Sequence, residues 1–269
     1  MSYLRPKSLA YVSDLAVRVT EGSIVERHEG YWRVETPNNP TFYWGNFLLF
    51  DETEGESDAQ EMVDLFHREL PAAKHVAIGI DATRHDDARY AGLDKLGIEV
   101  EWNAVLTASQ GIIAKNPDTD IEVRRIKTDE EWGQYIEVGM SVRPERFAET
   151  PYREYLEGGI SNKRSAQESG KAIWLGAVVD GVIAASLGVY DCGDGVARYQ
   201  KVETHLDHQR KGLASQLIHE AAALAAQDFG TQRLVIVADP EDYAITLYRK
   251  LGFVDTEFQL QSQRQPTFN

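Results

Sequence analysis

Hydrophobic and polar positions follow two periods along the chain, an alternation typical of half-buried strands and a wider spacing typical of helices. In the first half, the pattern predicts strands at 32–36, 42–50, 73–81 and 98–109, and helices at 59–70 and 88–97. In the second half, it predicts strands at 121–127, 172–181, 182–191, 196–205, 233–239 and 253–262, and helices at 128–141, 152–159, 212–227 and 242–252. This mixture predicts an α/β fold of the α+β type.

Local signals mark the ends of several of these elements. Thr128 followed by Glu131 predicts a capping box at the start of the helix over 128–141. Asp180 followed by Gly181 predicts a two-residue hairpin turn between two strands. Leucine and alanine recur at helical spacing through 212–227, so one face of that helix is expected to pack on a sheet.

The two halves of the chain carry the same order of elements. Each half ends with an apolar strand, an Asp, a short helix, Lys-Leu-Gly (95–97 and 250–252) and a further strand with Glu followed by an aromatic residue. This order indicates an internal repeat. The stretch KNPDTD at 115–120 lacks periodicity and predicts a linker. We therefore expect two domains, residues 1–117 and 118–269, each a mixed twisted sheet flanked by helices.

Charge and hydropathy limit the classes of partner. The chain has 43 acidic and 28 basic residues, which gives a formal net charge of −15. A field of this sign repels nucleic acid and anionic membranes, and it weakly favours a cationic substrate. No apolar run reaches the roughly 18 residues of a membrane helix, and the N-terminus lacks the apolar core of a signal peptide. We expect a cytoplasmic protein.

Cysteine and histidine usage predicts neither a disulfide nor a metal centre. Cys192 is the single cysteine, and its acidic neighbours disfavour the thiolate that a nucleophile needs. The seven histidines show no metal-ligand spacing. We expect chemistry without a metal and without a covalent enzyme intermediate.

The stretch HLDHQRKGLASQL at 205–217 is the strongest candidate for binding chemistry. Arg210 and Lys211 directly precede the helix predicted at 212–227, and Gly212 is its first residue. The first amides of a helix have no intrahelical acceptors, and the helix dipole adds positive charge there. Glycine lets an anion approach the backbone, so two cations at this end predict a phosphate or pyrophosphate site. The alternative is a solvated helix start with two surface cations.

The segment that contains this stretch resembles the GNAT superfamily of acyl-CoA-dependent N-acyltransferases. The family's phosphate motif is Arg or Gln, two residues, Gly, one residue, and Gly or Ala, which Gln209, Gly212 and Ala214 satisfy. Its later segment has an Ala, a Leu-Tyr pair and a Leu-Gly-Phe, present here at 244, 247–248 and 251–253. The resemblance covers about residues 121–262 and implies a GNAT fold with acetyl-CoA as co-substrate.

The resemblance also implies roles for individual residues. The residues expected to hold the CoA pyrophosphate are Gln209, Arg210, Lys211, Gly212, Leu213, Ala214 and Ser215. The main chain near Val202 and Thr204 would pair with the pantetheine arm. Tyr248 would protonate the departing thiolate as a general acid, and its alternative is a core aromatic on an amphipathic helix. Glu241 departs from the family pattern, because many members have Asn there.

A base for the acceptor amine is expected on the strand before the phosphate motif. Strand alternation puts Tyr199, Lys201, Glu203 and His205 on one face, unless a bulge interrupts it. Glu203 is the first candidate for the base and His205 the second, whereas Tyr199 would also reach the cleft. The alternative for all of them is an ordinary solvated strand face.

The first half of the repeat is expected to be non-catalytic. Aligned on Lys-Leu-Gly, Leu93 stands opposite Tyr248, and leucine donates no proton. The loop that corresponds to the phosphate motif carries Asp51, Glu52, Glu54, Glu56 and Asp58, which would repel a pyrophosphate. The aromatic residues Tyr31, Trp32, Tyr43 and Trp44 are expected in the sheet core rather than in a wall over the acceptor site.

Together the resemblance and the motif predict an N-acetyltransferase that moves an acetyl group from acetyl-CoA to a primary amine by direct attack in a ternary complex. One alternative is a non-catalytic acyl-CoA-binding or regulatory protein derived from such an enzyme. Another is a transferase that uses a longer acyl group. The pattern identifies neither the acceptor amine nor the oligomeric state.

Overall fold

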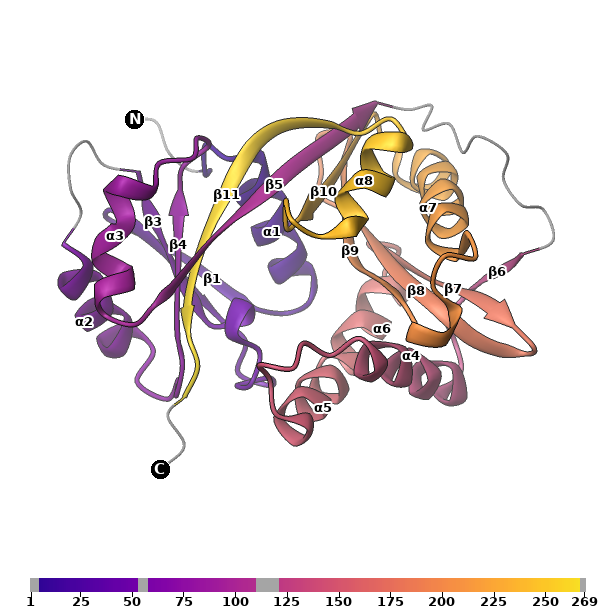
Figure 1. Cartoon of the computed structure of the whole chain (residues 1–269), viewed down its shortest axis with the longest axis horizontal. Helices are drawn as coiled ribbons and strands as arrows, with labels where there is room; N and C mark the ends of the chain where they lie inside the picture. The colour runs from indigo at the N-terminus through magenta and orange to yellow at the C-terminus, as the bar shows by residue number, and fades with distance from the viewer. Residues whose placement is uncertain (1–4, 53–57, 110–120, 267–269) are drawn as a thin grey trace. The chain divides into compact units, whose positions relative to one another are not determined.

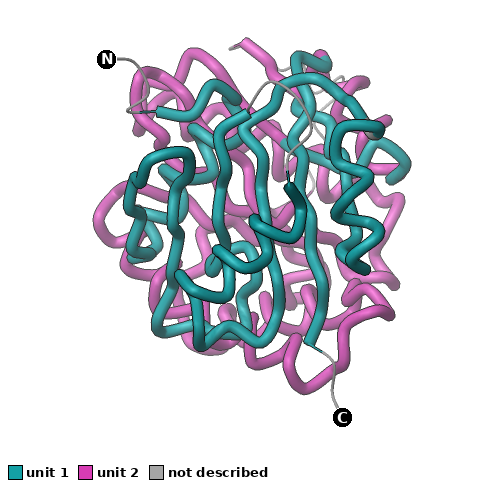
Figure 2. Tube along the Cα trace, turned by 90° about the vertical axis from the view of Figure 1, so that its left-hand side faces the viewer, with its two compact units in different colours: residues 1–105, 237–242, 255–269 teal, residues 106–236, 243–254 magenta. Residues whose placement is uncertain are grey.

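The computed structural model describes residues 5–52, 58–109 and 121–266 of the chain. The chain forms two compact units, which Figure 2 colours separately. Unit 1 comprises residues 1–105, 237–242 and 255–269, and unit 2 comprises residues 106–236 and 243–254. The linker expected at 115–120, and with it the boundary expected after residue 117, lies outside the described residues.

Unit 1 begins with a helix and then alternates strands and helices. Its elements are α1 Leu9–Thr20, β1 Ile24–His28, β2 Tyr31–Glu35, the short 3-10 helix η1 Tyr43–Gly45, β3 Phe47–Asp51, α2 Ala59–Glu69, β4 Val76–Asp81, α3 Asp87–Lys95, β5 Glu99–Ser109 (to Val105 in this unit) and β11 Val254–Arg264 (from Asp255). The order of its strands is β1-β2-β3-β4-β11-β5. The first three strands are antiparallel, and β3 and β4 are parallel.

The last strand of the chain is part of the sheet of unit 1. Residues 260–264 of β11 pair antiparallel with residues 76–80 of β4. Leu260 is fully buried, and its carbonyl accepts a hydrogen bond from the Tyr11 hydroxyl. The Trp44 indole donates to Gln263 Oε1 at 3.2 Å. Unit 1 is therefore built from both ends of the sequence, in contrast to the two contiguous domains expected above.

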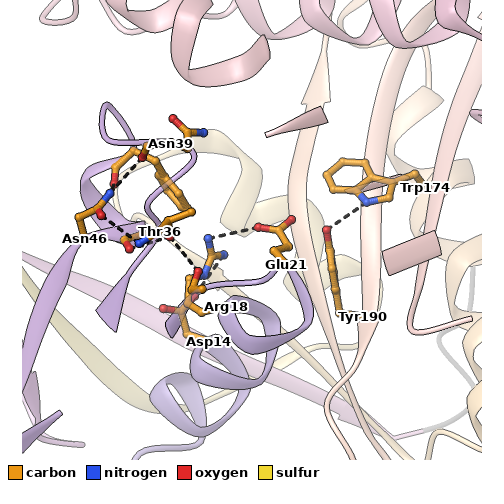
Figure 3. Close-up of polar contacts among 11 residues, drawn as sticks. Asp14, Arg18, Glu21, Thr36, Asn39, Asn46, Trp174 and Tyr190 are labelled. Carbon is orange, nitrogen blue, oxygen red and sulfur yellow. Dashed lines mark hydrogen bonds and ion pairs between the residues drawn. The ribbon is translucent and has the colours of Figure 1, made fainter. Parts of the chain in front are cut away.

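The core of unit 1 is apolar, and a buried ion-pair cluster lies at the end of α1. Tyr31 and Trp32 of β2 pack against this core, as expected for sheet aromatics. Tyr43 and Trp44 also pack against it, but from η1 rather than from a strand. In the last turn of α1, the buried Arg18 lies 3.7 Å from Asp14 and 3.4 Å from Glu21 (Figure 3). Its guanidinium also lies over the Phe42 ring.

Unit 2 contains the segment that carries the phosphate motif. Its elements are β6 Glu122–Arg125, α4 Asp129–Ser141, α5 Glu149–Gly158, α6 Ile160–Glu168, β7 Ala172–Val179, β8 Val182–Asp191, β9 Val196–Thr204, the 3-10 helix η2 Leu206–His208, α7 Leu213–Phe229, β10 Arg233–Ala238 (to Ile236 in this unit) and α8 Tyr243–Lys250. The order of its strands is β10-β9-β8-β7-β6. Only the β9–β10 pair in this order is parallel.

Helices cover both faces of the sheet of unit 2. Helix α7 packs on β7, β8 and β9 from one side, and α4 packs on β8 and β9 from the other (Figure 1). Between β7 and β8, Trp174 donates its indole N–H to the Tyr190 hydroxyl at 3.1 Å (Figure 3). The capping box of Thr128 and Glu131 is present at the start of α4, which confirms the prediction.

Both units show the same connection through their sheets. In unit 1, antiparallel strands lead through α2 to the parallel strand β4 and then to α3. In unit 2, antiparallel strands lead through α7 to the parallel strand β10 and then to α8. This shared order, with mixed sheets flanked by helices, confirms the predicted α+β class and the internal repeat.

Three sequence-based assignments differ from the structure. The run 42–50 is not one strand, because residues 43–45 form η1 before β3 begins at Phe47. Asn46 fixes this turn by accepting from the Thr36 amide and donating to the carbonyls of Asn39 and Phe42. The pattern also gave no sign of α1 and β1 or of α6.

Among the described residues, no helix has the length and apolar character that crossing a bilayer requires.

Candidate active site

The start of α7 in unit 2 is an open, positively charged helix terminus. The chain leaves β9, forms η2 and turns through Arg210 and Gly212, whose φ angles of 62° and 83° are left-handed. The Gln216 amide donates to Gly212 O at 3.0 Å, and Gly212 provides no side-chain cap. Within the described part of the chain, the amides of 213–215 have no recorded acceptor. These amides and the helix dipole can accommodate an anion.

The corresponding helix start in unit 1 is closed. The Asp58 carboxylate at the start of α2 accepts from the amides of Gln60 at 2.9 Å and Glu61 at 3.1 Å. These first-turn amides are therefore satisfied by a negative charge from the chain itself. Of the acidic loop expected to repel pyrophosphate, Glu54 and Glu56 lie outside the described residues, and Glu52 pairs with Arg89 and Lys7.

The side chains of the phosphate motif are not equivalent. The Lys211 ammonium donates to the Asp207 carbonyl at 2.9 Å, so it folds back onto η2. Arg210 and Gln209 are exposed. Leu213 is buried and anchors the first turn of α7 to the unit, whereas Ala214 and Ser215 are half-buried. The motif thus presents backbone amides and one extended cation, Arg210.

Strands β9 and β10 pair over only part of their length. Their register runs from Val196 opposite Arg233 to Arg198 opposite Val235, although β9 continues to Thr204. Beyond this point the strands separate, so the β10-facing edge of residues 199–204 has no recorded strand partner within unit 2 as described. An edge with free N–H and C=O groups can pair with an extended ligand.

Backbone alternation directs the main chain of Thr204 to this open edge. The His205 amide donates to Ala184 O at 2.9 Å, so residue 205 faces β8. Because successive residues of a strand direct their N–H and C=O groups to opposite edges, the main-chain groups of Thr204 face away from β8. Val202 lies within the register shift between Gln200 and Glu203, where this alternation does not apply. Of the two residues expected to contact pantetheine, Thr204 therefore directs its main chain to the edge where an extended chain would fit.

A β-bulge interrupts the alternation of β9 and corrects one expectation. Ser186 pairs with Glu203 and Gly188 with Gln200, so the register shifts between them, and Lys201 has a left-handed φ of 52°. Before the bulge, the Tyr199 hydroxyl donates to Ile218 O of α7 at 2.9 Å. After it, Glu203 faces Gly139 of α4. The expectation that Tyr199 and Glu203 share one face is therefore wrong, because the extra residue of a bulge reverses the alternation.

Lys201 and Glu203 form an ion pair beside the tyrosines of α5. The Lys201 ammonium lies 2.7 Å from Glu203 Oε1, and the side chains are 19% and 15% exposed. The same ammonium lies 3.4 Å from the Tyr152 hydroxyl. It also lies 5.5 Å and 5.3 Å from the ring centroids of Tyr152 and Tyr155. The site therefore contains a cation, a carboxylate and two aromatic rings within contact distance.

This surrounding shifts the pKa values of the groups around the pair. Burial lowers the pKa of the Lys201 ammonium, but Glu203 and the tyrosines outweigh burial and leave that pKa well above its ordinary value. Burial, with the Glu203 charge adding to it, raises the pKa of Tyr152 to about 12 although Lys201 opposes the shift. Lys201 is therefore a permanent cation at neutral pH, and Tyr152 remains a neutral phenol.

Tyr248 lies on α8 in an aromatic cluster of unit 2. It is 5% exposed, and its ring centroid lies 6.3 Å from that of Phe253. Phe253 in turn lies 6.0 Å from Tyr199. The Tyr248 ring is therefore packed against Phe253, which also contacts Tyr199 of β9, whereas Glu203 faces α4 and α5. Both roles expected for these residues remain proposals.

The other residues weighed for chemistry have local structural partners. His205 accepts from the Asp207 amide through Nδ1 at 3.3 Å and lies 5.9 Å from the His208 ring. Cys192 is buried at the end of β8. Among the residues that the structure describes, no group of three or more His, Cys, Asp or Glu side chains is arranged to hold a metal. Glu241 donates its amide to Asp239 Oδ1, within the turn after β10.

Sequence reasoning missed the part of the site that α5 contributes. Tyr152 and Tyr155 were not singled out, and Lys201 was named only as a member of a strand face. A signal was present, because two tyrosines three residues apart lie on one face of a helix. The contact between that face and Lys201 joins segments 49 residues apart, which local periodicity does not reveal.

The two units define a tandem α+β protein with an open helix start in its second unit. Residues 131–253 match the model of the acetyltransferase (GNAT) family. The match begins in the first turn of α4 and extends through α8. No curated protein matches the sequence.

Solved structures share the fold over most of the chain. A conserved protein of unknown function from Staphylococcus epidermidis has a TM-score of 0.74 at 13% identity and covers 91% of this chain and 95% of its own. A GCN5-related N-acetyltransferase from Kribbella flavida has a TM-score of 0.62 at 13% identity, with coverage of 95% and 96%. A tandem GNAT protein from the clavulanic acid biosynthesis pathway has a TM-score of 0.55 at 13% identity, with coverage of 78% and 69%.

Proposed function

We propose that unit 2 is an N-acetyltransferase that transfers the acetyl group of acetyl-CoA to a primary amine. The observation that carries this proposal is the open start of α7, where the amides of 213–215 have no side-chain cap and the exposed Arg210 lies two residues before Gly212 in the sequence. A pyrophosphate complements this terminus. The family of residues 131–253 favours CoA among pyrophosphate carriers.

The free edge of β9 supports an extended path for the CoA arm. In the proposal, the pyrophosphate binds at Gly212 and the pantetheine amides pair with the main chain of Val202 and Thr204. The thioester then lies near the bulge at Lys201, where β9 and β10 have separated. The acyl carbon would thus be held between the Tyr248 cluster and the Lys201–Glu203 pair.

The chemistry proposed is direct attack in a ternary complex. The amine nitrogen forms a bond to the acyl carbon and loses a proton, directly or through water, to a base, for which Glu203 is the candidate. The carbon–sulfur bond breaks, and CoA leaves as a thiolate that Tyr248 protonates. No covalent enzyme intermediate is required, and Cys192 is buried away from solvent. Unit 1, whose α2 start is capped by Asp58, is assigned a structural role without CoA binding.

Two experiments test the proposal together. Calorimetry with CoA should show binding at one site per chain, and free-thiol release from acetyl-CoA should appear with a panel of primary amines. Binding without release across the panel would favour the non-catalytic acyl-CoA-binding alternative. Release from longer acyl-CoA esters but not from acetyl-CoA would instead favour the longer acyl group. Absence of CoA binding would contradict the proposal.

A further inference from the structure

The Lys201–Glu203 pair gives the centre of unit 2 a carboxylate whose charge is already matched. The pair is mostly buried, at 19% and 15% side-chain exposure, with a separation of 2.7 Å. The pair Lys171–Asp191 in the same unit has a similar separation of 2.9 Å, but its lysine is 57% exposed. Exposed pairs are screened by water, whereas a buried pair acts on its neighbours at lower dielectric.

Neither oxygen of Glu203 is available as a free charged acceptor. Oε1 is engaged by the Lys201 ammonium. Oε2 is covered and has no hydrogen-bond partner, and a Cβ at Gly139 would lie 3.3 Å from it. Ser186, directly opposite Glu203 on β8, is fully buried, and its hydroxyl likewise has no partner. A carboxylate in this state does not offer a separate docking point for an ammonium group.

The aromatic surround holds the lysine rather than a substrate cation. Tyr152 and Tyr155 face the Lys201 ammonium with their rings, as cation-binding aromatic sites do. The groups that act on this ammonium are Glu203 of β9, Tyr155 and Tyr152 of α5 and Tyr135 of α4, and β8 contributes the uncharged Ser186. The cation subsite that these groups form is therefore filled by a residue of the chain.

We propose that Lys201 is the specificity-determining residue of the acceptor site and restricts it to weakly basic amines that bind uncharged. This inference rests on the proposed acetyl transfer. A second ammonium group would lose hydration beside a buried pair whose charges already cancel, and no unmatched carboxylate is left to compensate that loss. An α-amino group, with a pKa of about 7.7–8.0, loses its proton at far lower cost than a side-chain amine near 10.4.

The local charge thus opposes the preference that the global charge suggests. The net charge of −15 attracts cations over long distances, but salt screens that field. At the reacting centre, the neutral amine nitrogen forms the bond to the acyl carbon as the carbon–sulfur bond breaks. The proton lost by nitrogen balances the proton gained by the CoA sulfur. The substrate class that follows is a small molecule or peptide with an α-amino group, rather than a polyamine.

The test compares two amines in charge-altered variants of the full chain. The probes are alaninamide, which has an α-amine, and Nα-acetyl-lysinamide, which has an ε-amine. The measured quantity is the ratio of kcat/KM for the ε-amine to kcat/KM for the α-amine, from thiol release. Lys201→Met leaves Glu203 unmatched and should raise this ratio about tenfold, the equivalent of one pKa unit. Lys201→Arg keeps the charge and should leave it within about twofold of wild type.

Two further variants keep the test decisive if Lys201→Met does not fold. Glu203→Gln leaves Lys201 unmatched and should lower the ratio, whereas Lys201→Met combined with Glu203→Gln restores a neutral pair and should return it to the wild-type value. Lys171→Met, at the exposed pair, is the matched control and should not change it. A ratio that stays within about twofold of wild type in all folded variants overturns the role of Lys201 while acetyl transfer stands. Wild-type protein that releases no thiol with either amine overturns the proposed function itself and this role with it.

Discussion

Tyr199 and Glu203 lie on the same strand, β9, but on opposite faces of the sheet of unit 2. The Tyr199 hydroxyl donates to Ile218 O of α7, whereas Glu203 accepts from Lys201 beside α5. The bulge at Lys201 causes this change of face. It directs Tyr199 toward α7 and the Lys201–Glu203 pair toward α4 and α5.

Replacing Tyr248 by phenylalanine tests the proposed general acid. Tyr248→Phe keeps the ring and its packing on Phe253, so CoA affinity should stay within about twofold of wild type. The rate of thiol release should fall about 100-fold or more, because a general acid contributes that much to a proton transfer. Calorimetry and single-turnover kinetics measure the two effects. Release at the wild-type rate by a folded Tyr248→Phe protein would remove the phenol from the mechanism.

Arg210 is expected to contribute charge rather than structure to the proposed pyrophosphate site at the start of α7. Its φ of 62° is left-handed, so Arg210→Gly removes the cation and also relieves backbone strain of roughly 1 kcal/mol. The melting temperature should stay equal or rise. CoA affinity should weaken about three- to tenfold at low salt, and less at high salt.

Asp194→Gly is the matched control for this substitution. Asp194 also has a left-handed φ, 50°, but it lies in the turn between β8 and β9. Asp194→Gly relieves the same kind of backbone strain but keeps the Arg210 cation, so CoA affinity should stay unchanged. If Arg210→Gly bound CoA as tightly as wild type at low salt, the Arg210 charge would have no part in CoA binding.

The capping box of α4 should make the stability of unit 2 depend on pH. Glu131 Oε2 accepts from the amides of Lys127 at 2.8 Å and Thr128 at 3.0 Å, and these bonds lower the pKa of Glu131. Because the folded-state pKa is depressed, the stabilisation is complete above the unfolded value of about 4.3 and is lost as the pH falls through the folded value.

Glu131→Ala should therefore destabilise the protein by about 0.5–2 kcal/mol at neutral pH. The difference from wild type should shrink in acid. Urea unfolding at pH 7 and pH 3.5 measures it, with Glu130→Ala, an exposed neighbour, as the control. A penalty that is the same at both pH values would mean that the carboxylate charge has no part in the cap.

Strand β11 should be required for the fold of unit 1. Removal of residues 254–269 deletes the partner of β4 and exposes the core around Leu260. The amides of residues 76–80 should then lose most of their protection in hydrogen exchange. Removal of residues 265–269 alone leaves β11 intact and should preserve the protection. Protected β4 amides in the shorter protein would show that unit 1 folds without the C-terminal strand.

The parts of the fold that depend on local pattern were predictable from sequence. The capping box at Thr128, the hairpin at Asp180 and the strand–helix–strand order of both halves follow from neighbouring residues. The position of β11 was not predictable in this way. Its alternating pattern is satisfied by any apolar sheet, and pairing with β4 joins positions more than 170 residues apart, such as Leu260 and Ile80.

The candidate site, like the fold, was predictable from sequence only where it depends on neighbouring residues. The glycine and amides at the start of α7 follow from the motif, because the chemistry belongs to the backbone. The face occupied by Glu203 did not follow, since one extra residue at Lys201 reverses the alternation that the sequence suggests. The partners Tyr152 and Tyr155 come from a helix distant in sequence, so only the fold places them beside the pair.

Calorimetric titration of CoA into matched glycine variants of α7 tests the central claim most directly. Gly212 and Gly230 flank the helix with left-handed φ values of 83° and 64°, and no heavy atom lies closer than 3.9 Å to a Cβ built at either. Gly212→Val and Gly230→Val should lose similar stability through backbone strain. CoA should bind wild type and Gly230→Val with equal affinity and bind Gly212→Val at least about tenfold more weakly, because the side chain blocks the approach of the pyrophosphate. Equal affinity in all three proteins, or no binding to wild type, would contradict the account.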